Sequence, residues 1–295
     1  MRINRYVLRL PAMSATPQTF EPIVRLTAQW RRGGAWLGPA WAVLCGVIAS
    51  GGFRWEGYSL AQVAMALILA EGIWTTLWAS LAGVKWDEPL ARWATWTTGQ
   101  PFVQLPYTQP GSPAARLSVV LGQLRAWLKE DFMPSYGSAL ASVILAALIA
   151  LALAMMLGAP AILLTILALS LSQLGLVLCR GNGAPNPFLR GLVEMTLPTL
   201  LGFVIYKPLT LEIIIAAIGF GITYAGAVSA RWNIPLWNVG QAVVLGLLVA
   251  MRHSVGVFAL ALLWLPQFLL QAQPMARNAQ WWSMATMLVA ALAIA

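Results

Sequence analysis

Nine runs of apolar residues, most of them close to 20 residues long, follow one another from residue 35 to residue 295. A helix of about 20 apolar residues is long enough to cross the hydrocarbon core of a bilayer. Glycine and proline interrupt the pattern between several of these runs, as in Gly51-Gly52 and Lys207-Pro208. The sequence therefore predicts an all-α, polytopic membrane protein with nine transmembrane helices, at residues 35–51, 59–83, 138–157, 160–179, 191–206, 209–229, 236–251, 254–272 and 279–295.

The composition agrees with this reading, because 60% of the residues are hydrophobic and only 9% are charged. Soluble domains have about a quarter of charged residues, so this chain has too little polar surface to stay in water. The net charge of +9 would suggest nucleic acid as a partner for a soluble protein. In a membrane protein, Lys and Arg gather instead in the loops on one side of the bilayer. We therefore expect a lipid bilayer, and no nucleic acid, as the partner.

The positions of the basic residues predict the orientation. With the N-terminus in the cytoplasm, fifteen of the 18 Lys and Arg residues fall in cytoplasmic segments and only Arg54, Lys207 and Arg252 fall outside. This asymmetry is the positive-inside pattern of multi-pass proteins. It predicts a cytoplasmic segment at 1–34, a single transmembrane domain at 35–295, and an inner membrane, either cytoplasmic or photosynthetic, as the location.

One long break between spans, residues 84–137, contains an amphipathic stretch. Leu117, Val120, Leu121, Leu124 and Leu128 recur at helical spacing on one face, and the other face is mostly polar. This pattern is typical of a helix that lies in the membrane interface. We expect an interfacial helix at 113–130 that covers a cavity opening to the cytoplasmic side of the bundle.

Ionisable residues inside predicted spans are candidates for function, because a charge is costly at membrane depth. Glu71 and Glu194 lie within the second and fifth spans, and a polar neighbour or a functional role would explain either. Glu212 and His253 lie near outer helix ends. His253 is the only histidine, so a haem with two histidine ligands is excluded within this chain.

Motifs of soluble enzymes are absent from the sequence. It contains no phosphate-binding glycine loop, no nucleophile elbow and no HExxH zinc motif. The two cysteines, Cys45 and Cys179, lie in apolar runs and have neither metal-site spacing nor a disulfide framework. We predict no catalytic residues and no metal site from these patterns.

Two stretches resemble a known family. In "RGNGAPNPFLRGLVEMTLPTLLGFVIY", residues 180–206, Gly191, Leu192, Glu194 and Gly202 match the stretch before the fifth span of menaquinone-type members of the UbiA superfamily, which are intramembrane prenyltransferases. "TGQPF", residues 98–102, is similar to a segment that follows the first acidic motif of that family. The resemblance implies a UbiA-like helical bundle with an apolar cavity for an isoprenoid chain.

The resemblance fails at the two aspartate-rich motifs with which the family holds magnesium ions on a prenyl diphosphate. In "ASLAGVKWDEP", only Asp87 or, in a register shifted by one, Glu88 is an acid at the spacing of the first motif. In "YAGAVSAR", Tyr224 matches the second motif, but Val228 and Arg231 occupy the positions of its acids. Asp87, Glu88, Glu194, Tyr224 and Arg231 are therefore expected to form a vestigial or ligand-binding site without a metal.

Three functions stay open at this point. The first is a non-catalytic UbiA-like protein that binds a lipid, a quinone or a (bacterio)chlorophyll, or that is a structural subunit of a photosynthetic or respiratory membrane complex beside other integral membrane subunits. The second is an active, Mg-dependent prenyltransferase with an aromatic or tetrapyrrole acceptor, in which Asp87 and Glu88 hold magnesium and arginines neutralise the diphosphate. The third is a transporter or scramblase, although the internal repeat common in such proteins is not visible.

Overall fold

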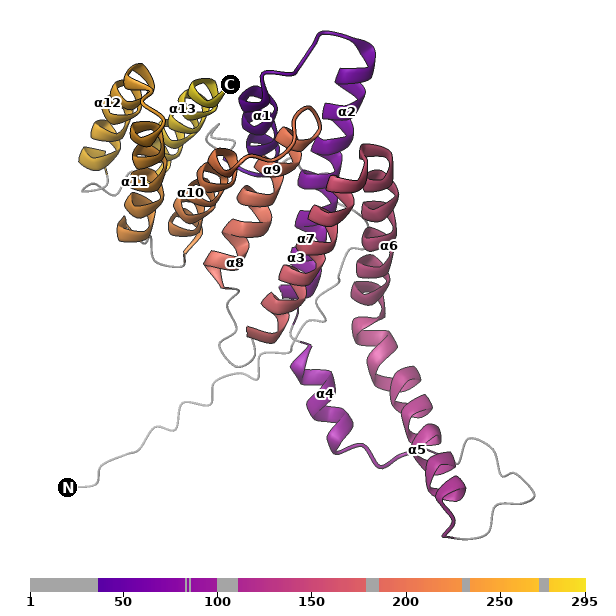
Figure 1. Cartoon of the computed structure of the whole chain (residues 1–295). Coiled ribbons are helices and arrows are strands. Elements are labelled where there is room, and N and C mark those ends of the chain that lie inside the picture. Colours follow the sequence, from indigo (N-terminus) through magenta and orange to yellow (C-terminus); the bar gives the residue numbers. More distant parts are fainter. Residues whose placement is uncertain are drawn as a thin grey trace, which may run out of the picture.

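The computed structural model describes residues 37–82, 84, 86–99, 111–178, 186–229, 234–270 and 276–295. All regular secondary structure within these residues is helical (Figure 1). The predicted all-α class is therefore confirmed for the described part of the chain. The predicted cytoplasmic segment 1–34 lies outside the described residues.

Seven helices are regular α-helices along their whole length: α1 (Pro39–Ser50), α4 (Asp87–Ala94), α7 (Ala159–Leu178), α10 (Leu211–Val228), α11 (Ile234–Ala250), α12 (Ser254–Leu270) and α13 (Ala276–Ile294). Three longer helices contain a π-helical segment: α2 (Gly57–Leu67), η1 (Ile68–Trp74) and α3 (Thr75–Ala82); α5 (Pro113–Trp127), η2 (Leu128–Phe132) and α6 (Met133–Leu157); and α8 (Pro187–Gly191), η3 (Leu192–Thr196) and α9 (Leu197–Val204).

Four stretches of the described chain are long and apolar enough to cross a membrane: Gly57–Ala94, Pro113–Leu157, Ala159–Leu178 and Leu211–Val228. Shorter apolar helices accompany them at Pro39–Ser50, Pro235–Ala250, Ser254–Pro266 and Gln280–Ile294. By length and composition the chain is a multi-pass membrane protein. The count of nine spans and the cytoplasmic N-terminus stay predictions.

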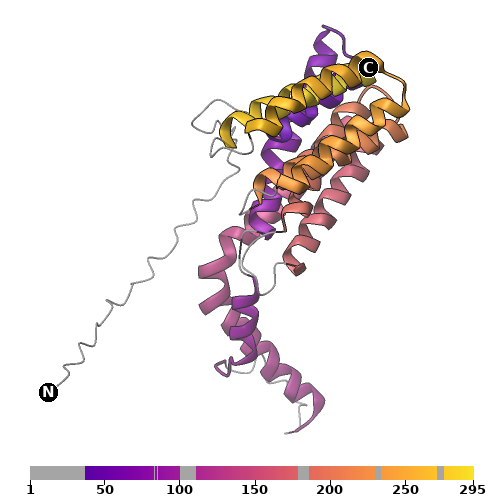
Figure 2. The same ribbon diagram turned by 90° about the vertical axis from the view of Figure 1, so that its left-hand side faces the viewer.

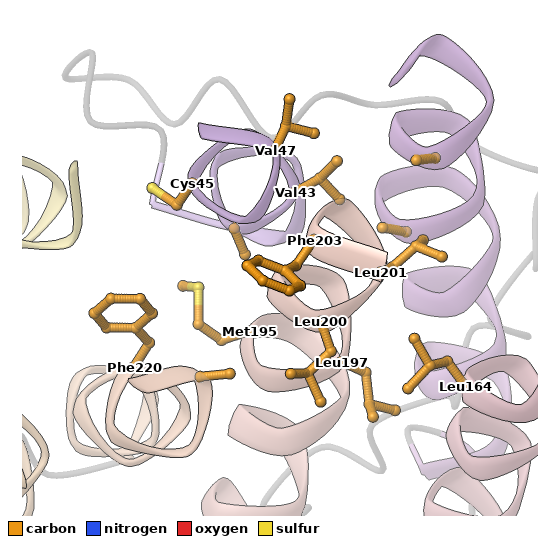
Figure 3. Close-up of a cluster of buried hydrophobic side chains, with 14 of the residues drawn as sticks. Val43, Cys45, Val47, Leu164, Met195, Leu197, Leu200, Leu201, Phe203 and Phe220 are labelled. Atoms are coloured by element: carbon orange, nitrogen blue, oxygen red, sulfur yellow. The ribbon is translucent and has the colours of Figure 1, made fainter. Parts of the chain in front are cut away.

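Close contacts between backbones hold the centre of the bundle together. A Cβ atom on Gly46 of α1 would overlap the carbonyl oxygen of Thr199 in α9, and one on Gly202 of α9 would overlap the carbonyl oxygen of Val43. Small residues at helix interfaces are typical of membrane proteins, because they let two backbones approach closely. Figure 3 shows the side chains around this contact, among them Phe203.

The outer faces of the bundle are apolar. Large hydrophobic side chains are exposed on α6, α7 and α12, including Leu148, Met156, Leu163, Val255, Phe258, Leu262 and Leu265. In Figure 1, α12 and α6 lie at opposite ends of the bundle. On α12, Val255, Phe258, Leu262 and Leu265 recur at helical spacing and form one continuous face. These faces are suited to lipid tails or to the apolar surface of another membrane protein.

The helix predicted at 113–130 is present, but it does not lie across the bundle. It continues through η2 into α6 as one helix of 45 residues, Pro113–Leu157. Such a helix is about 67 Å long, more than twice the thickness of the hydrocarbon core of about 30 Å. In Figures 1 and 2, α5 extends away from the other long helices together with α4. The position of this helix in the membrane interface and the cavity beneath it stay predictions.

Pro134 lies between the predicted helix at 113–130 and the predicted span at 138–157. Proline in an α-helix removes an N–H donor, and its ring collides with the carbonyl group four residues earlier. Here the wider π-helical segment η2 directly precedes Met133 and Pro134. Insertion of a π turn changes the local hydrogen-bonding pattern, which allows the helix to continue past the proline.

We expect Gly202→Ala to destabilise the protein strongly, since the new Cβ would overlap the backbone of α1. Overpacking of a rigid contact costs about 1–3 kcal/mol, and here no flexible side chain can move aside. Thermal unfolding of the purified protein in lipid nanodiscs measures the effect. Gly246→Ala is the matched control, because a Cβ there meets no atom within 4 Å. Equal melting temperatures for the two variants would contradict the close α1–α9 contact.

Candidate functional site

The most buried charged group among the described residues is the carboxylate of Glu194, in η3. Glu194 is only 5% exposed. Arg190 donates through Nε to its Oε1 atom at 2.9 Å, and Tyr224 donates through its hydroxyl to Oε2 at 2.6 Å. Of the two explanations that the sequence leaves open for Glu194, the structure thus provides the polar neighbours. We call Arg190, Glu194 and Tyr224 the carboxylate cluster.

The local sequence positions this cluster through two helices. Asn186 caps α8 by accepting from Phe188 N at 2.9 Å, and Arg190 lies four residues before Glu194 on the same face. A Cβ on Gly191 would overlap the carbonyl oxygen of Gly221, so the start of this helix lies directly against α10, which carries Tyr224. The glycine contact thus brings the tyrosine within reach of the glutamate.

A second bond fixes η3 on α10. The hydroxyl of Thr196 donates to the carbonyl oxygen of Ala217 at 3.0 Å. Pro198 lies four residues after Glu194 and has no N–H to donate to the carbonyl group of Glu194. A regular α-helix would lose this hydrogen bond, so the local hydrogen-bonding pattern has to change. The π-helical segment between Leu192 and Thr196 provides this adjustment and carries Glu194 at its centre.

The chemistry of the cluster follows from its contacts. Each oxygen of Glu194 accepts a hydrogen bond from a group of the same chain, and Arg190 compensates its charge. A buried carboxylate with a cation and a hydroxyl donor is satisfied in a medium of low dielectric constant. A metal ion or ligand would compete with Arg190 and Tyr224 for these two oxygens. The arrangement therefore favours a stable link between α8 and α10.

Asp87 and Glu88 belong to another part of the molecule. Both are exposed in the first turn of α4, where a carboxylate interacts favourably with the helix dipole. Tyr136 of α6 donates to Glu88 at 3.4 Å. In Figure 1, α4 lies beside the lower part of the α5–α6 helix and apart from α8. The structure thus brings Glu194 and Tyr224 together, and it places Asp87 and Glu88 elsewhere.

An aromatic cluster holds α4 in this position. Trp93 packs on Trp127 with ring centroids 5.5 Å apart, and the contacts continue through Phe132 and Tyr136 to Trp86. Beside it, Arg92 donates to Asp131 at 2.9 Å.

A groove of about 460 Å³ lies nearby, lined in its described part by Leu121, Leu124, Arg125, Leu128, Lys129 and Met133.

Arg231 lies outside the described residues, as does Gly83 in the first motif. Val228, at the other acid position of the second motif, is the last residue of α10 and is partly buried. Within the described chain, no three residues of the types His, Cys, Asp and Glu lie close enough to share a metal ion.

Glu71, the other acid within a predicted span, has a structural role. Its Oε2 atom accepts from the backbone N–H of Ala40, in the first turn of α1, at 3.0 Å. Helix N-termini have unpaired N–H groups and a positive dipole end, and a carboxylate satisfies both. His253 is exposed at the turn between α11 and α12.

Arg190 is the residue whose role could have been found from the sequence, where arginines were considered only for neutralising a diphosphate. The signal was present, because Arg190 and Glu194 are four residues apart and share a helix face. The contact of Tyr224 with Glu194 joins residues 30 apart in sequence. Only the packing of α8 on α10 reveals it.

No protein-family model, curated protein or solved structure matches this chain. The resemblance to the UbiA superfamily stays a prediction, which depends on the short matches at 98–102, at 180–206 and at Tyr224.

We expect Arg190→Met to lower the free energy of unfolding by about 3 kcal/mol, the lower end of the range for breaking a buried ion pair. The reason is that Glu194, at 5% exposure, would keep a charge without its cation. Replacing both residues, Arg190→Met with Glu194→Met, should restore most of the loss, since no uncompensated charge is left.

Arg116→Met is the control, because Arg116 is exposed on α5. Its effect should stay within about 0.5 kcal/mol, as for most surface substitutions. Denaturant titration of the variants in a fixed mixed micelle gives the comparison. If the double variant is destabilised by the sum of the effects of the single variants Arg190→Met and Glu194→Met, the link between Arg190 and Glu194 has no energetic importance.

Proposed function

We propose that this chain is a non-catalytic, UbiA-like membrane protein that acts as a structural subunit of a larger membrane complex. The apolar ligand class that fits this proposal is an isoprenoid chain, as found in quinones, lipids and (bacterio)chlorophylls. The observation that carries the proposal is the state of Glu194, whose two oxygens are already bound by Arg190 and Tyr224.

Departure of a diphosphate needs divalent ions, held by several oxygen ligands at one place. The described acidic residues are not gathered at one place. Glu194 is paired inside the bundle, Glu71 caps α1, and Asp87 and Glu88 are on α4. This distribution supports a role in which the acids stabilise helix packing.

The outer faces support the role of a subunit. Phe258 and Leu262 of α12 are 72% and 61% exposed, and Leu163 of α7 is 68% exposed. A continuous exposed apolar face of this kind is typical of a surface that contacts lipid or another membrane protein. Because the faces of α12 and α6 lie at opposite ends of the bundle, the chain offers two separate places for neighbours.

The test of the subunit role is tryptophan substitution on these faces, followed by native mass spectrometry after gentle solubilisation. We expect Leu262→Trp or Leu163→Trp to reduce the co-purifying complex at least tenfold, because a bulky ring opens a packed protein interface and is tolerated by fluid lipid. Unchanged complexes in both variants, or a chain that purifies alone without an isoprenoid lipid, would contradict the proposal.

A second experiment separates this role from an active prenyltransferase. We expect no transfer of a prenyl group to an aromatic acceptor and only weak magnesium binding, because Arg231 stands at an acid position of the second motif. The variant with Gly83→Asp, Val228→Asp and Arg231→Asp restores the acids and should bind magnesium more tightly. Isothermal titration with magnesium and a prenyl diphosphate measures both proteins. Magnesium-dependent transfer by the unmodified chain, abolished by Asp87→Ala, would establish an enzyme instead.

A further inference from the structure

The part of the α5–α6 helix that extends from the bundle carries a regular leucine pattern. Leu117, Leu121, Leu124 and Leu128 are spaced by four, three and four residues. This is the spacing of the core positions of a coiled coil, in which apolar residues recur every 3.5 residues on average. Leu117 and Leu121 are 59% and 40% exposed, and their neighbour Val120 is 47% exposed.

One side of α5 is covered by α4. Gly122 and Trp127 are the buried residues of α5, and Trp127 packs on Trp93 of α4. A Cβ on Gly99 would lie 2.7 Å from the Cα atom of Gln123, so the chain after α4 also lies on this side. At 100° per residue, Gln123 and Trp127 lie about 90–130° around the helix from the centre of the leucine stripe. Leu124 and Leu128 are partly buried, so Leu117 and Leu121 form the exposed part of the stripe.

We propose that the leucine stripe of α5, formed by Leu117, Leu121, Leu124 and Leu128, pairs with the same stripe of a second copy of this chain. All copies in one membrane have the same orientation, so their α5 helices leave the bilayer in the same direction. Two equal stripes then meet in parallel and in register, which is the arrangement that heptad spacing supports. This pairing does not depend on the function proposed above.

The flanking residues are compatible with a parallel pair. Beside the stripe, Val120 and Arg125 occupy the positions that face each other across a parallel coiled coil. In a symmetric dimer, Val120 of one copy therefore packs against the aliphatic part of Arg125 of the other copy. No two like charges face each other at these positions.

Two heptads are few for a free peptide, but here the helix is already formed. It begins at Ser112, which accepts from Ala115 N at 3.2 Å, and it continues into α6. The aromatic contacts with α4 hold it in place. Pairing therefore does not require folding of the helix, and both partners are anchored in one membrane, which raises their effective concentration.

The π-helical segment η2 sets the lower limit of the paired region. It begins at Leu128, the last leucine of the stripe, and shifts the phase of the helix before Met133. The helical positions in α6 that would extend the stripe are therefore rotated away from the partner. The contact is confined to residues 117–128, outside the predicted span at 138–157.

Cysteine cross-linking of the full chain in native membranes tests the pairing. In a background with Cys45→Ala and Cys179→Ala, Leu121→Cys is compared with Val119→Cys. Both native side chains are 40% exposed, and two residues along a helix turn them 200° apart. We expect oxidation to give a disulfide-linked dimer of Leu121→Cys at least ten times faster than one of Val119→Cys. Equal rates, or absence of a dimer in both variants, would overturn the proposal.

A second measurement distinguishes pairing of the leucine stripe with a second copy from binding of the stripe to the bilayer. The double variant Leu121→Glu with Leu124→Glu should convert the dimer into a monomer in native mass spectrometry, whereas Val119→Glu should leave it dimeric. A fluorescent label on Leu121→Cys should be quenched by a label on a second copy. Quenching by labelled lipid instead, with a monomeric mass, would show that the stripe lies on the bilayer and would refute the pairing.

Discussion

Within a bilayer, two helices gain little by burying apolar side chains against each other, since lipid tails are equally apolar. Dispersion contacts and hydrogen bonds must hold them together, and both need close approach. Within the described residues, glycines provide it between α1 and α9, between the start of α8 and α10, and between α10 and α11. The last contact places a Cβ on Gly240 at 2.5 Å from the carbonyl oxygen of Gly219. The positions of the polar groups follow from these backbone contacts.

Hydrogen bonds between helices then add specificity to the glycine contacts. Gln241 of α11 donates to Ser283 and Thr286 of α13, and Trp264 of α12 donates to Asn238 of α11. Each bond is worth little in free energy, because the unfolded chain in a membrane finds other partners. Together they restrict how α11, α12 and α13 rotate against one another. The same logic applies to the bond from Tyr224 to Glu194, which joins α10 to η3 where Gly191 meets Gly221.

Much of the fold could be predicted from the sequence, because apolar runs and turn residues are local signals. The helices fall at the expected places, and the burial of Glu194 follows from the cost of a charge in lipid. The course of the 113–130 helix could not be predicted. Its amphipathic pattern is the same whether it lies on a membrane or leads into α6, and only the π turn before Pro134 distinguishes the two. The separation of Asp87 and Glu88 from Tyr224 also depends on tertiary packing.

The scarcity of acids connects this packing with function. The chain has nine Asp and Glu residues for 18 Lys and Arg residues. Of these, Glu194 and Asp131 pair with arginines, Glu71 accepts from the start of α1, and Glu88 accepts from Tyr136. Each contact joins helices or stabilises a helix end, so moving that acid to a ligand would weaken the bundle. A protein that spends its few carboxylates in this way gains a rigid apolar scaffold. This use of the carboxylates agrees with the structural role proposed above.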